Sequence, residues 1–269
     1  MKDITSRDNQ WIKAACALKQ KKGRWEAHRF FAEGFRIICD AIHVGVTDGV
    51  CFVSPKGQSH PGFSQLEAAG EKLGWEFFAV TEAVYDKLKD TKNPQGLAAM
   101  LPFLPHSLAS LQGLDPKRPV LYLEAIQDPG NLGTILRTAA AANAAAVLLS
   151  EDSVDVYNDK TIRSAMGAIF KIPVVQQVTQ EELLAFRRQS GRQLLGTTPD
   201  GTISYAAVAY DNPHILAFGN EGNGLTAACL QACDHLVSIP MRKDTESLNL
   251  SLSVGLVLYK AWEMNGFKE

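Results

Sequence analysis

The sequence predicts an α/β protein made of two domains, and three observations support that prediction. Apolar runs of strand length alternate with segments of helical periodicity along most of the chain, as in proteins whose sheets are covered by helices. A proline-rich stretch without periodicity interrupts the alternation, and we take it as a linker over residues 105–118. A chain of 269 residues with 46% hydrophobic residues has enough apolar side chains for a separate hydrophobic core on each side of this linker. We therefore expect an N-terminal domain over residues 1–104 and a C-terminal domain over residues 119–269.

The N-terminal domain is predicted to alternate helices with short strands. The first helix begins at Asn9, and a basic turn, Lys21-Lys22-Gly23-Arg24, is expected after it. Thr81 is suited to cap the last helix, because its hydroxyl can accept a backbone N–H of the first turn. The expected helices cover residues 9–21, 35–44, 65–73 and 81–88, and the expected strands cover residues 29–34, 50–54, 75–80 and 96–101.

The C-terminal domain shows the same alternation, which favours a mostly parallel sheet. In such sheets ligands bind beyond the carboxyl ends of the strands, so polar residues that directly follow a strand are the candidates for a site. The expected strands cover residues 120–124, 145–149, 174–175, 193–196, 215–218 and 236–239, and the expected helices cover residues 131–142, 158–170, 181–189, 226–233 and 247–264.

Charge and composition restrict the function only weakly. The net charge is −2, but residues 1–38 hold nine basic residues against four acidic ones, an excess that either contacts phosphates or forms a solvated helix face. The five cysteines are irregularly spaced and predict reduced structural thiols without a metal site. No apolar run reaches membrane-spanning length and no signal-peptide core is present, so we expect a cytoplasmic protein without a membrane partner.

The first candidate stretch is Asp128-Pro129-Gly130-Asn131-Leu132-Gly133-Thr134-Ile135-Leu136-Arg137. Asn131 is placed to cap the helix that follows the first strand of the C-terminal domain. Arg137 lies among apolar neighbours, where a guanidinium needs either a carboxylate partner or an anionic ligand. The stretch therefore indicates either a structural ion pair or a clamp for a phosphate or ribose.

The second candidate stretch, residues 218–225, puts Glu221 and the glycines 219, 222 and 224 directly after a strand. Glycines let a backbone approach a ligand closely and adopt positive φ. The spacing is G-x-x-G-x-G rather than the dinucleotide-binding G-x-G-x-x-G, and no acidic residue follows at the distance that a ribose contact requires. These two differences argue against a nicotinamide-dependent oxidoreductase.

The third candidate stretch, residues 239–253, runs from a strand end bent by Pro240 through a charged loop into an apolar helix. Ser247 is an N-cap candidate, and Asn249 and Ser251 add small polar groups to the same turn. A single cap needs only one such group. The cluster therefore points to a ligand site at this junction, with simple capping as the alternative for Ser247.

These stretches, in this order, resemble the three motifs of the SpoU-type (TrmH-like) RNA 2′-O-ribose methyltransferases. Residues 31–36 and 90–96 resemble the L30e-like substrate-binding domain of the same family. The resemblance implies a C-terminal SPOUT methyltransferase domain with a trefoil knot. It also implies a homodimer, in which the first-motif arginine reaches the partner's cofactor.

The resemblance also implies a cofactor, S-adenosyl-L-methionine, and no metal, because the leaving group is already activated. The residues implied as catalytic are Arg137, Asn131, Glu221, Ser247 and Asn249. The residues expected to contact the cofactor are Thr197, Thr198, Gly219, Asn220, Gly222, Ile239, Met241, Leu248 and Asn249. The residues expected to contact RNA are Lys22, Arg24, Arg36, Lys92, Gln95 and Arg137. One departure is the charged loop Arg242–Thr245, where relatives typically carry a glycine, while the motif from Glu246 to Leu250 is intact.

The expected reaction is methyl transfer to a ribose 2′-hydroxyl, with ribosomal (23S) RNA favoured over tRNA as substrate. A guanidinium is almost never deprotonated, so Arg137 suits orientation of the phosphate and stabilisation of charge better than a role as base. Glu221 is the alternative proton acceptor. A ribosome-assembly protein that binds RNA without catalysis is the non-enzymatic alternative.

Overall fold

The computed structural model describes residues 1–244 and 247–268, so Thr245 and Glu246 of the third candidate stretch lie outside the described residues. The chain forms two compact units. Unit 1 comprises Met1–Pro105 and Tyr157–Phe170, and unit 2 comprises His106–Val156 and Lys171–Glu269. The segment Tyr157–Phe170 was expected in the C-terminal domain and instead groups with unit 1, because Tyr157 stacks on Phe103 and Phe30 with ring centroids 4.1 and 4.8 Å away.

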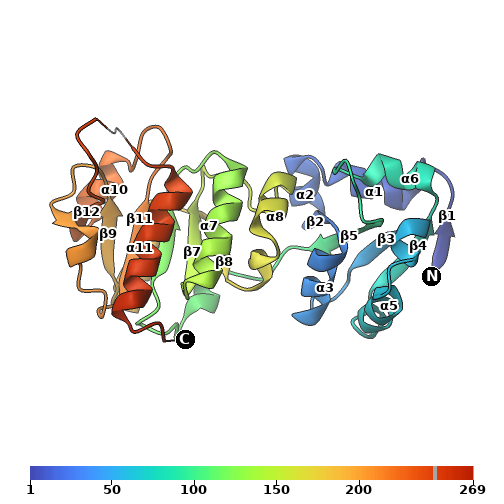
Figure 1. Ribbon diagram of the computed structural model, residues 1–269, viewed down its shortest axis with the longest axis horizontal. Coiled ribbons are helices and arrows are strands. Elements are labelled where there is room, and N and C mark those ends of the chain that lie inside the picture. The colour runs from blue at the N-terminus through green and yellow to red at the C-terminus, as the bar shows by residue number, and fades with distance from the viewer. Residues whose placement is uncertain (245–246, 269) are drawn as a thin grey trace. The chain divides into compact units, whose positions relative to one another are not determined.

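Unit 1 contains a five-stranded mixed sheet with the strand order β1-β4-β3-β5-β2 (Figure 1). Strand β5 runs antiparallel to β2 and β3, and the other pairs are parallel. The sequence pattern missed β1, because three residues are too short to show a period. The strands are β1 (Lys2–Ile4), β2 (Arg29–Glu33), β3 (Val50–Val53), β4 (Glu76–Val80) and β5 (Leu97–Pro102).

The predicted helices of unit 1 occur in the expected order, with two differences: the short helix α4 follows β3 where only a strand end was expected, and a predicted turn is helical. The segment expected as a basic turn is helix α2, and a side chain at Gly23 would lie 2.2 Å from the carbonyl oxygen of Ala17. Gly23 therefore permits close packing of α2 against the end of α1 instead of breaking the chain. Thr81 caps α6 as predicted, accepting from the N–H of Val84. The helices are α1 (Gln10–Ala17), α2 (Lys21–Ala27), α3 (Phe35–His43), α4 (Pro55–Gln58), α5 (Phe63–Lys72), α6 (Glu82–Leu88), α8 (Asp159–Ala165) and the short η2 (Ala168–Phe170).

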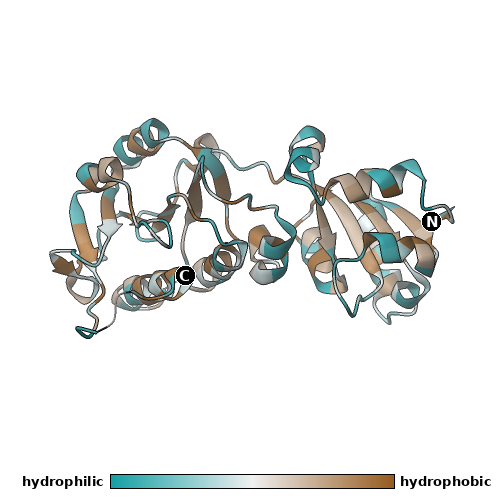
Figure 2. Ribbon diagram, turned by 90° about the horizontal axis from the view of Figure 1, so that it is seen from above, coloured by the Kyte–Doolittle hydropathy of each residue, from teal (hydrophilic) through white to brown (hydrophobic). Residues whose placement is uncertain are grey.

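Unit 2 contains a seven-stranded sheet in the order β10-β12-β9-β11-β6-β7-β8, and all of its strand pairs are parallel, as the alternation predicts. The strands are β6 (Val120–Leu123), β7 (Ala146–Ser150), β8 (Val174–Val178), β9 (Gln193–Thr197), β10 (Ile203–Ser204), β11 (His214–Phe218) and β12 (His235–Ser238). The central strands are buried on both faces, which is why their sequences are continuously apolar (Figure 2).

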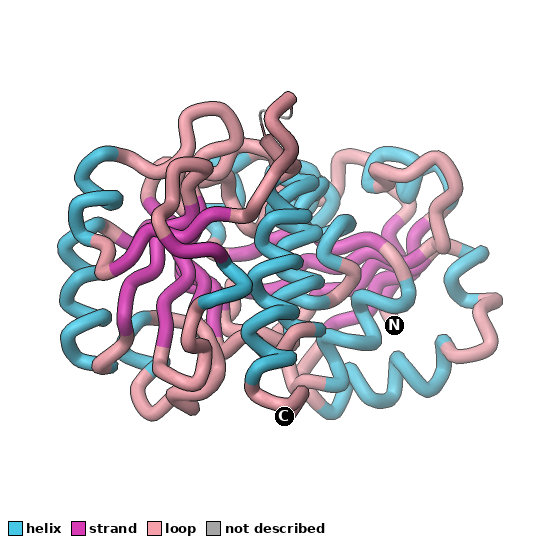
Figure 3. The backbone as a smooth tube through the Cα atoms, turned by 60° about the vertical axis from the view of Figure 1, so that its left-hand side comes forward, coloured by secondary structure: helices cyan, strands magenta, loops and turns pink. Residues whose placement is uncertain are grey.

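Helices cover both faces of the unit 2 sheet (Figure 3). Helices α7 and α11 lie side by side on one face, and a side chain at Gly255 of α11 would meet Thr138 of α7 at 3.6 Å. Side chains of α9 and α10, including Leu183 and Cys229, join the core on the other face. The helices are η1 (Leu108–Leu111), α7 (Pro129–Ala141), α9 (Gln180–Ser190), η3 (Tyr205–Ala207), α10 (Ala227–Ala232) and α11 (Leu250–Met264). Among the described residues, no helix combines the length and the apolar composition that a membrane crossing requires.

The strand order of unit 2 reverses at β6. The chain continues from β6 to β7 and β8 on one side, and then returns to place β11, β9 and β12 on the other side. The loops that follow β6 and β11 therefore open beside each other at the carboxyl edge of the sheet. Such a switch point is where open α/β sheets bind ligands.

Candidate active site

A pocket of about 530 Å³ lies at the carboxyl edge of the unit 2 sheet. It is lined by the loops that follow β9, β11 and β12 and by the residues that lead into α11. The predicted cofactor residues that line it are Thr197, Thr198, Gly219, Asn220, Gly222, Ile239, Met241 and Leu248. Glu221 and Ser247 line it as well, whereas Asn131, Arg137 and Asn249 are outside its lining.

The loop after β11 is held in one conformation by its own backbone. Asn220 and Gly224 exchange two backbone hydrogen bonds of 3.0 and 2.9 Å, and Gly224 has a φ of +69°. The side-chain oxygen of Asn220 accepts from the N–H groups of Gly222 and Asn223, and its amide donates to the carbonyl of Ala125 at 2.8 Å. The Asn220 side chain is thus occupied in shaping the loop, which leaves backbone groups to face a ligand.

Side-chain hydrogen bonds connect the three candidate stretches. The carboxylate of Glu221 accepts from the amide of Asn131 at 3.2 Å. The side-chain oxygen of Asn131 in turn accepts from the amide of Asn249 at 3.0 Å. The backbone N–H groups of Gln127 and Asp128 each donate to Glu221 at 3.1 Å. Residues from three distant parts of the chain therefore form one network beside the pocket.

Two helix caps differ from those predicted. Asp128, not Asn131, caps α7, because its carboxylate accepts from the N–H groups of Gly130 and Asn131. Asn249, not Ser247, caps α11 and accepts from the N–H of Ser251 at 2.9 Å. Because Asp128 caps α7, the Asn131 side chain is not needed as a cap and instead hydrogen-bonds to Glu221 and Asn249. An aspartate followed by proline is a known start signal for a helix and was the feature that could have identified Asp128.

The electrostatics of Glu221 make it a weak proton acceptor. Burial alone would raise the pKa of this carboxyl, but its hydrogen bonds, including those from Asn131, Asp128 and Gln127, outweigh burial and hold the pKa below its ordinary value of 4.5. A carboxylate stabilised in this way binds a proton less readily than a free one. This geometry favours a positioning role, in which Glu221 holds the loop after β6 against the loop after β11.

We expect Glu221→Gln to destabilise the protein by about 1–2 kcal/mol at neutral pH, because the amide cannot accept all the N–H groups that now point at the carboxylate. A carboxyl whose pKa is lower in the folded than in the unfolded state stabilises the fold at pH values above its unfolded-state pKa. This stabilisation is lost as the pH falls through the folded-state pKa. The difference in unfolding free energy between wild type and variant should thus be constant near neutrality and shrink below about pH 4.5. Urea unfolding at a series of pH values measures it, and a difference that grows on acidification would contradict the lowered pKa.

Arg137 is exposed on α7 and does not line the pocket of its own chain. It shares the outer face of α7 with Thr134 and Ala141, which are also exposed. Within the described part of the chain its guanidinium has neither a hydrogen bond nor an ion pair, so the alternative of a structural ion pair is not realised there. The charge is therefore available to a ligand or to a second protein chain.

The predicted RNA contacts of unit 1 are dispersed, and one of them is corrected. Arg24 is 3% exposed and donates to the backbone carbonyls of Leu18 and Lys19, so burial removes it from any RNA-binding surface. Lys22 is exposed beside Glu26, its ion-pair partner at 3.7 Å. Arg36, Lys92 and Gln95 are exposed near the carboxyl ends of β2 and β3.

The basic excess of residues 1–38 is partly balanced within unit 1. Ion pairs of the described residues engage five of these cations, three with carboxylates elsewhere in unit 1 and two with carboxylates of the same segment, which favours the solvated alternative for part of the excess. The pairs are Lys2–Glu76, Lys13–Asp8, Lys19–Asp90, Lys22–Glu26 and Arg29–Asp48.

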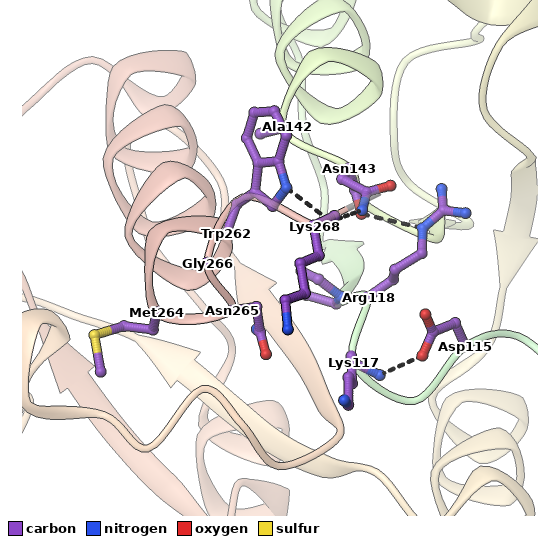
Figure 4. A pocket seen from close by; sticks show the side chains of 11 residues that line it. Asp115, Lys117, Arg118, Ala142, Asn143, Trp262, Met264, Asn265, Gly266 and Lys268 are labelled. Carbon is purple, nitrogen blue, oxygen red and sulfur yellow. Dashed lines mark hydrogen bonds between the residues drawn. The ribbon is translucent and has the colours of Figure 1, made fainter.

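A second pocket of similar size lies at the other end of α7 and α11 and contains none of the predicted site residues (Figure 4). The Arg118 guanidinium there donates to the carbonyls of Asn143 and Ala144. The carbonyl of Lys268 accepts from the side chains of Asn143 and Trp262 at 2.8 and 3.0 Å. These bonds hold the chain after α11 against the end of α7, which gives this pocket a structural explanation.

The lining of the first pocket suits a nucleoside-type ligand. Its volume falls within the range of small-molecule sites. Val237, Ile239 and Leu248 provide apolar surface for a flat base, whereas Thr198 and Asp200 provide polar groups. Asp200 was not singled out from the sequence, because Pro199-Asp200-Gly201 has the composition of an ordinary turn. The pocket thus fits the cofactor that the motifs imply.

The fold and the site together define an α/β protein with a pocket of nucleoside size at the carboxyl edge of a parallel sheet. The model of the SpoU rRNA methylase family matches residues 118–259, and that of the MRM3-like substrate-binding domain matches residues 9–99. The chain therefore belongs to the SpoU rRNA methylase family, as the three motifs predicted, and is an S-adenosylmethionine-dependent RNA 2′-O-methyltransferase.

Similar proteins cover nearly the whole chain. The 23S rRNA (guanosine(2553)-2′-O)-methyltransferase RlmP of Bacillus subtilis is 32% identical, over 96% of this chain and 98% of its own. An uncharacterised tRNA/rRNA methyltransferase of Synechocystis is 34% identical, over 96% of this chain and 92% of its own. The crystal structure of an AdoMet-bound rRNA methyltransferase from Sinorhizobium meliloti is similar with a TM-score of 0.89 and 30% identity, covering 97% of each chain.

Proposed function

We propose that this protein methylates a ribose 2′-hydroxyl of 23S rRNA in the cytoplasm. The observation that carries the proposal is the hydrogen-bond network Glu221–Asn131–Asn249, which joins all three motifs at the rim of a nucleoside-sized pocket. Relatives of similar length that act on 23S rRNA support the choice of RNA. Other relatives act on guanosine, adenosine and uridine, so family membership does not fix the base.

The chemistry divides among a few residues. Bound S-adenosylmethionine supplies a methyl group that its sulfonium already activates. Backbone groups near Gly219, Ile239 and Leu248 hold it, with Thr197, Thr198, Asn220, Gly222 and Met241 completing the lining, while Asn249 lies outside the lining and donates to Asn131. Arg137 orients the ribose–phosphate and stabilises negative charge that develops on the 2′-oxygen. Ser247 lies at the pocket wall, where its hydroxyl can contact the ribose.

We further propose that the active enzyme is a homodimer in which Arg137 enters the pocket of the second copy. The outer face of α11 carries an apolar stripe of Leu252, Leu256 and Tyr259, which are 53%, 36% and 45% exposed. This i, i+4, i+7 spacing places them on one side of α11, which packs against α7, the helix that carries Arg137. Apolar stripes of this kind suit a self-complementary interface with two-fold symmetry. The trefoil knot stays a prediction of the family resemblance.

We expect Leu256→Glu to convert the dimer into a monomer, because a carboxylate in the centre of an apolar interface loses its solvation. Sedimentation velocity measures the assembly state, and methyl transfer should fall with the dimer fraction. Val44→Glu is the matched control, since Val44 is 48% exposed and belongs to unit 1, whereas Leu256 belongs to unit 2. A Leu256→Glu protein that remains dimeric would rule out this face as the interface.

The proposed function is tested by incubating the protein with tritium-labelled S-adenosylmethionine and rRNA purified from a strain that lacks its gene. We expect label in 23S rRNA and one 2′-O-methyl site that is absent from the deletion strain and restored by the enzyme. Incorporation into tRNA alone, or into no RNA, would refute the assignment.

A further inference from the structure

The carboxyl ends of β2 and β3 in unit 1 carry an aromatic pair that the reaction described above does not use. The rings of Phe35 and His60 stack with centroids 3.7 Å apart and an angle of 23° between their planes. Both residues are half-buried. Phe35 opens α3, and His60 lies between α4 and α5.

Two glycines and two hydrogen bonds hold this pair in place. Gly34 has a φ of +121°, and a side chain at Gly62 would lie 2.7 Å from the ring tip of Phe35. The N–H of Phe35 donates to the side-chain oxygen of Gln95 at 2.7 Å. The Nδ1 of His60 accepts from the N–H of Gly62 at 3.2 Å, which places the proton of the neutral ring on Nε2. The rings are therefore preorganised before any ligand arrives.

Uncompensated positive charge surrounds the pair. Strands β2, β3 and β5 are neighbours, with Glu33 opposite Ala98 and Val53 opposite Leu97, so the loops at their ends lie at one edge of the sheet. These loops and the adjoining helices carry the exposed cations Arg36, Lys56 and Lys92.

The ammonium of Lys56 lies 2.6 Å from the carbonyl of Pro94, which brings it to the loop that carries Lys92 and Gln95. In the described part of the chain, neither Arg36 nor Lys92 takes part in an ion pair.

The acidic residues of the same edge are already engaged. The carboxylate of Glu33 accepts from the N–H groups of Asp90 and Thr91 and from the Thr91 hydroxyl. Asp90 pairs with Lys19 at 2.7 Å. The edge therefore combines a preorganised, half-buried aromatic pair with cations that are exposed to solvent.

We propose that the Phe35–His60 pair is a stacking platform for one unpaired base of the substrate RNA, with Arg36, Lys56 and Lys92 contacting the flanking phosphates. This proposal rests on the proposed function for the identity of the substrate. Cationic loops around an aromatic surface are the arrangement by which proteins bind single strands, since every base has a face that stacks. A paired base in an A-form duplex has no free face, so the platform selects an unpaired segment.

Variants of the protein separate the effect of the stacked rings from that of the hydrogen bond between Gly62 and His60. Phe35→Leu removes the phenyl ring but keeps an apolar side chain. His60→Asn removes the imidazole ring but keeps an acceptor for the N–H of Gly62, whereas His60→Phe keeps an aromatic ring without that acceptor. His43→Asn, at the other end of α3, is the matched control because His43 is exposed. The probes are a fluorescein-labelled single-stranded RNA of mixed sequence, a duplex of the same length and a 23S rRNA transcript.

We expect Phe35→Leu and His60→Asn to weaken binding of the single strand about 10-fold, the loss of one stacked base. The KM for the transcript should rise by the same factor while kcat and the affinity for S-adenosylmethionine stay unchanged. His60→Phe, His43→Asn and binding of the duplex should stay at wild-type values. Unchanged single-strand affinity in both ring-less variants, with a wild-type enzyme that methylates the transcript, would overturn the platform and leave the function intact. If the ring-less variants bind the single strand more weakly but the wild-type protein methylates no RNA, the proposed function would be refuted and the stacking platform retained.

Discussion

Arg137→Ala is expected to lower kcat about 10²- to 10³-fold, the loss typical of removing one charged group that stabilises a transition state. The affinity for S-adenosylmethionine should remain unchanged, because the proposed contacts of Arg137 are with the ribose–phosphate of the substrate and not with the cofactor. Arg137→Lys should be intermediate, since a lysine keeps the charge but cannot bind a phosphate with two parallel N–H groups. Single-turnover methyl transfer and calorimetric titration of the cofactor measure the two quantities separately.

Arg188→Ala is the control for the loss of an exposed arginine. Arg188 lies on α9, which covers the other face of the unit 2 sheet, and its removal should leave kcat unchanged. Wild-type turnover by Arg137→Ala would remove this residue from the mechanism. A large loss of cofactor affinity in the same variant would place its guanidinium at the cofactor instead of the substrate.

Gly219→Ala is expected to destabilise unit 2 by about 1–3 kcal/mol and to weaken cofactor binding at least about 10-fold. An added methyl group would lie 2.0 Å from the carbonyl carbon of Gly224 and 2.1 Å from the nitrogen of Leu225. Both are backbone atoms, held by the two hydrogen bonds between Asn220 and Gly224, so the loop that walls the pocket must shift. Chemical denaturation and titration with S-adenosylmethionine measure the two effects.

Gly222→Ala, in the same loop, is the matched control. The nearest atom to an added methyl group there is the side-chain oxygen of Asn220 at 3.6 Å, an ordinary contact. We expect its unfolding free energy to stay within about 0.5 kcal/mol of wild type. Equal behaviour of the two alanine variants would show that close backbone approach at Gly219 does not shape the site.

The sequence predicted the architecture and the pocket better than the details of the helix ends. Strands buried in a parallel sheet give continuous apolar runs, and the polar residues after β9, β11 and β12 fall at one edge for topological reasons. The caps were assigned to Asn131 and Ser247, but Asp128 and Asn249 fill them. Several neighbouring residues of a turn can cap a helix, and only the tertiary contacts decide among them.

Other features depend on contacts between distant parts of the chain. Gly23 resembles a turn residue, yet its function is to let α2 approach Ala17. Arg24 resembles a phosphate contact, yet its guanidinium binds carbonyls within unit 1. The segment of Tyr157 joins unit 1 through aromatic stacking across more than fifty residues of sequence, as its contacts with Phe103 and Phe30 show. Local patterns carry no information about such partners.

In the proposed homodimer, Arg137 of another copy completes the pocket between the second and third motifs. The most direct measurement uses a heterodimer of Arg137→Ala and Gly219→Ala chains, purified through two different tags and shown by sedimentation to be a dimer. One of its two pockets would combine an intact cofactor loop with an intact arginine from the other chain, so it should recover about half of the wild-type activity per dimer. Activity no higher than that of the two parent variants would contradict the claim, because an arginine that served its own chain would leave both sites defective.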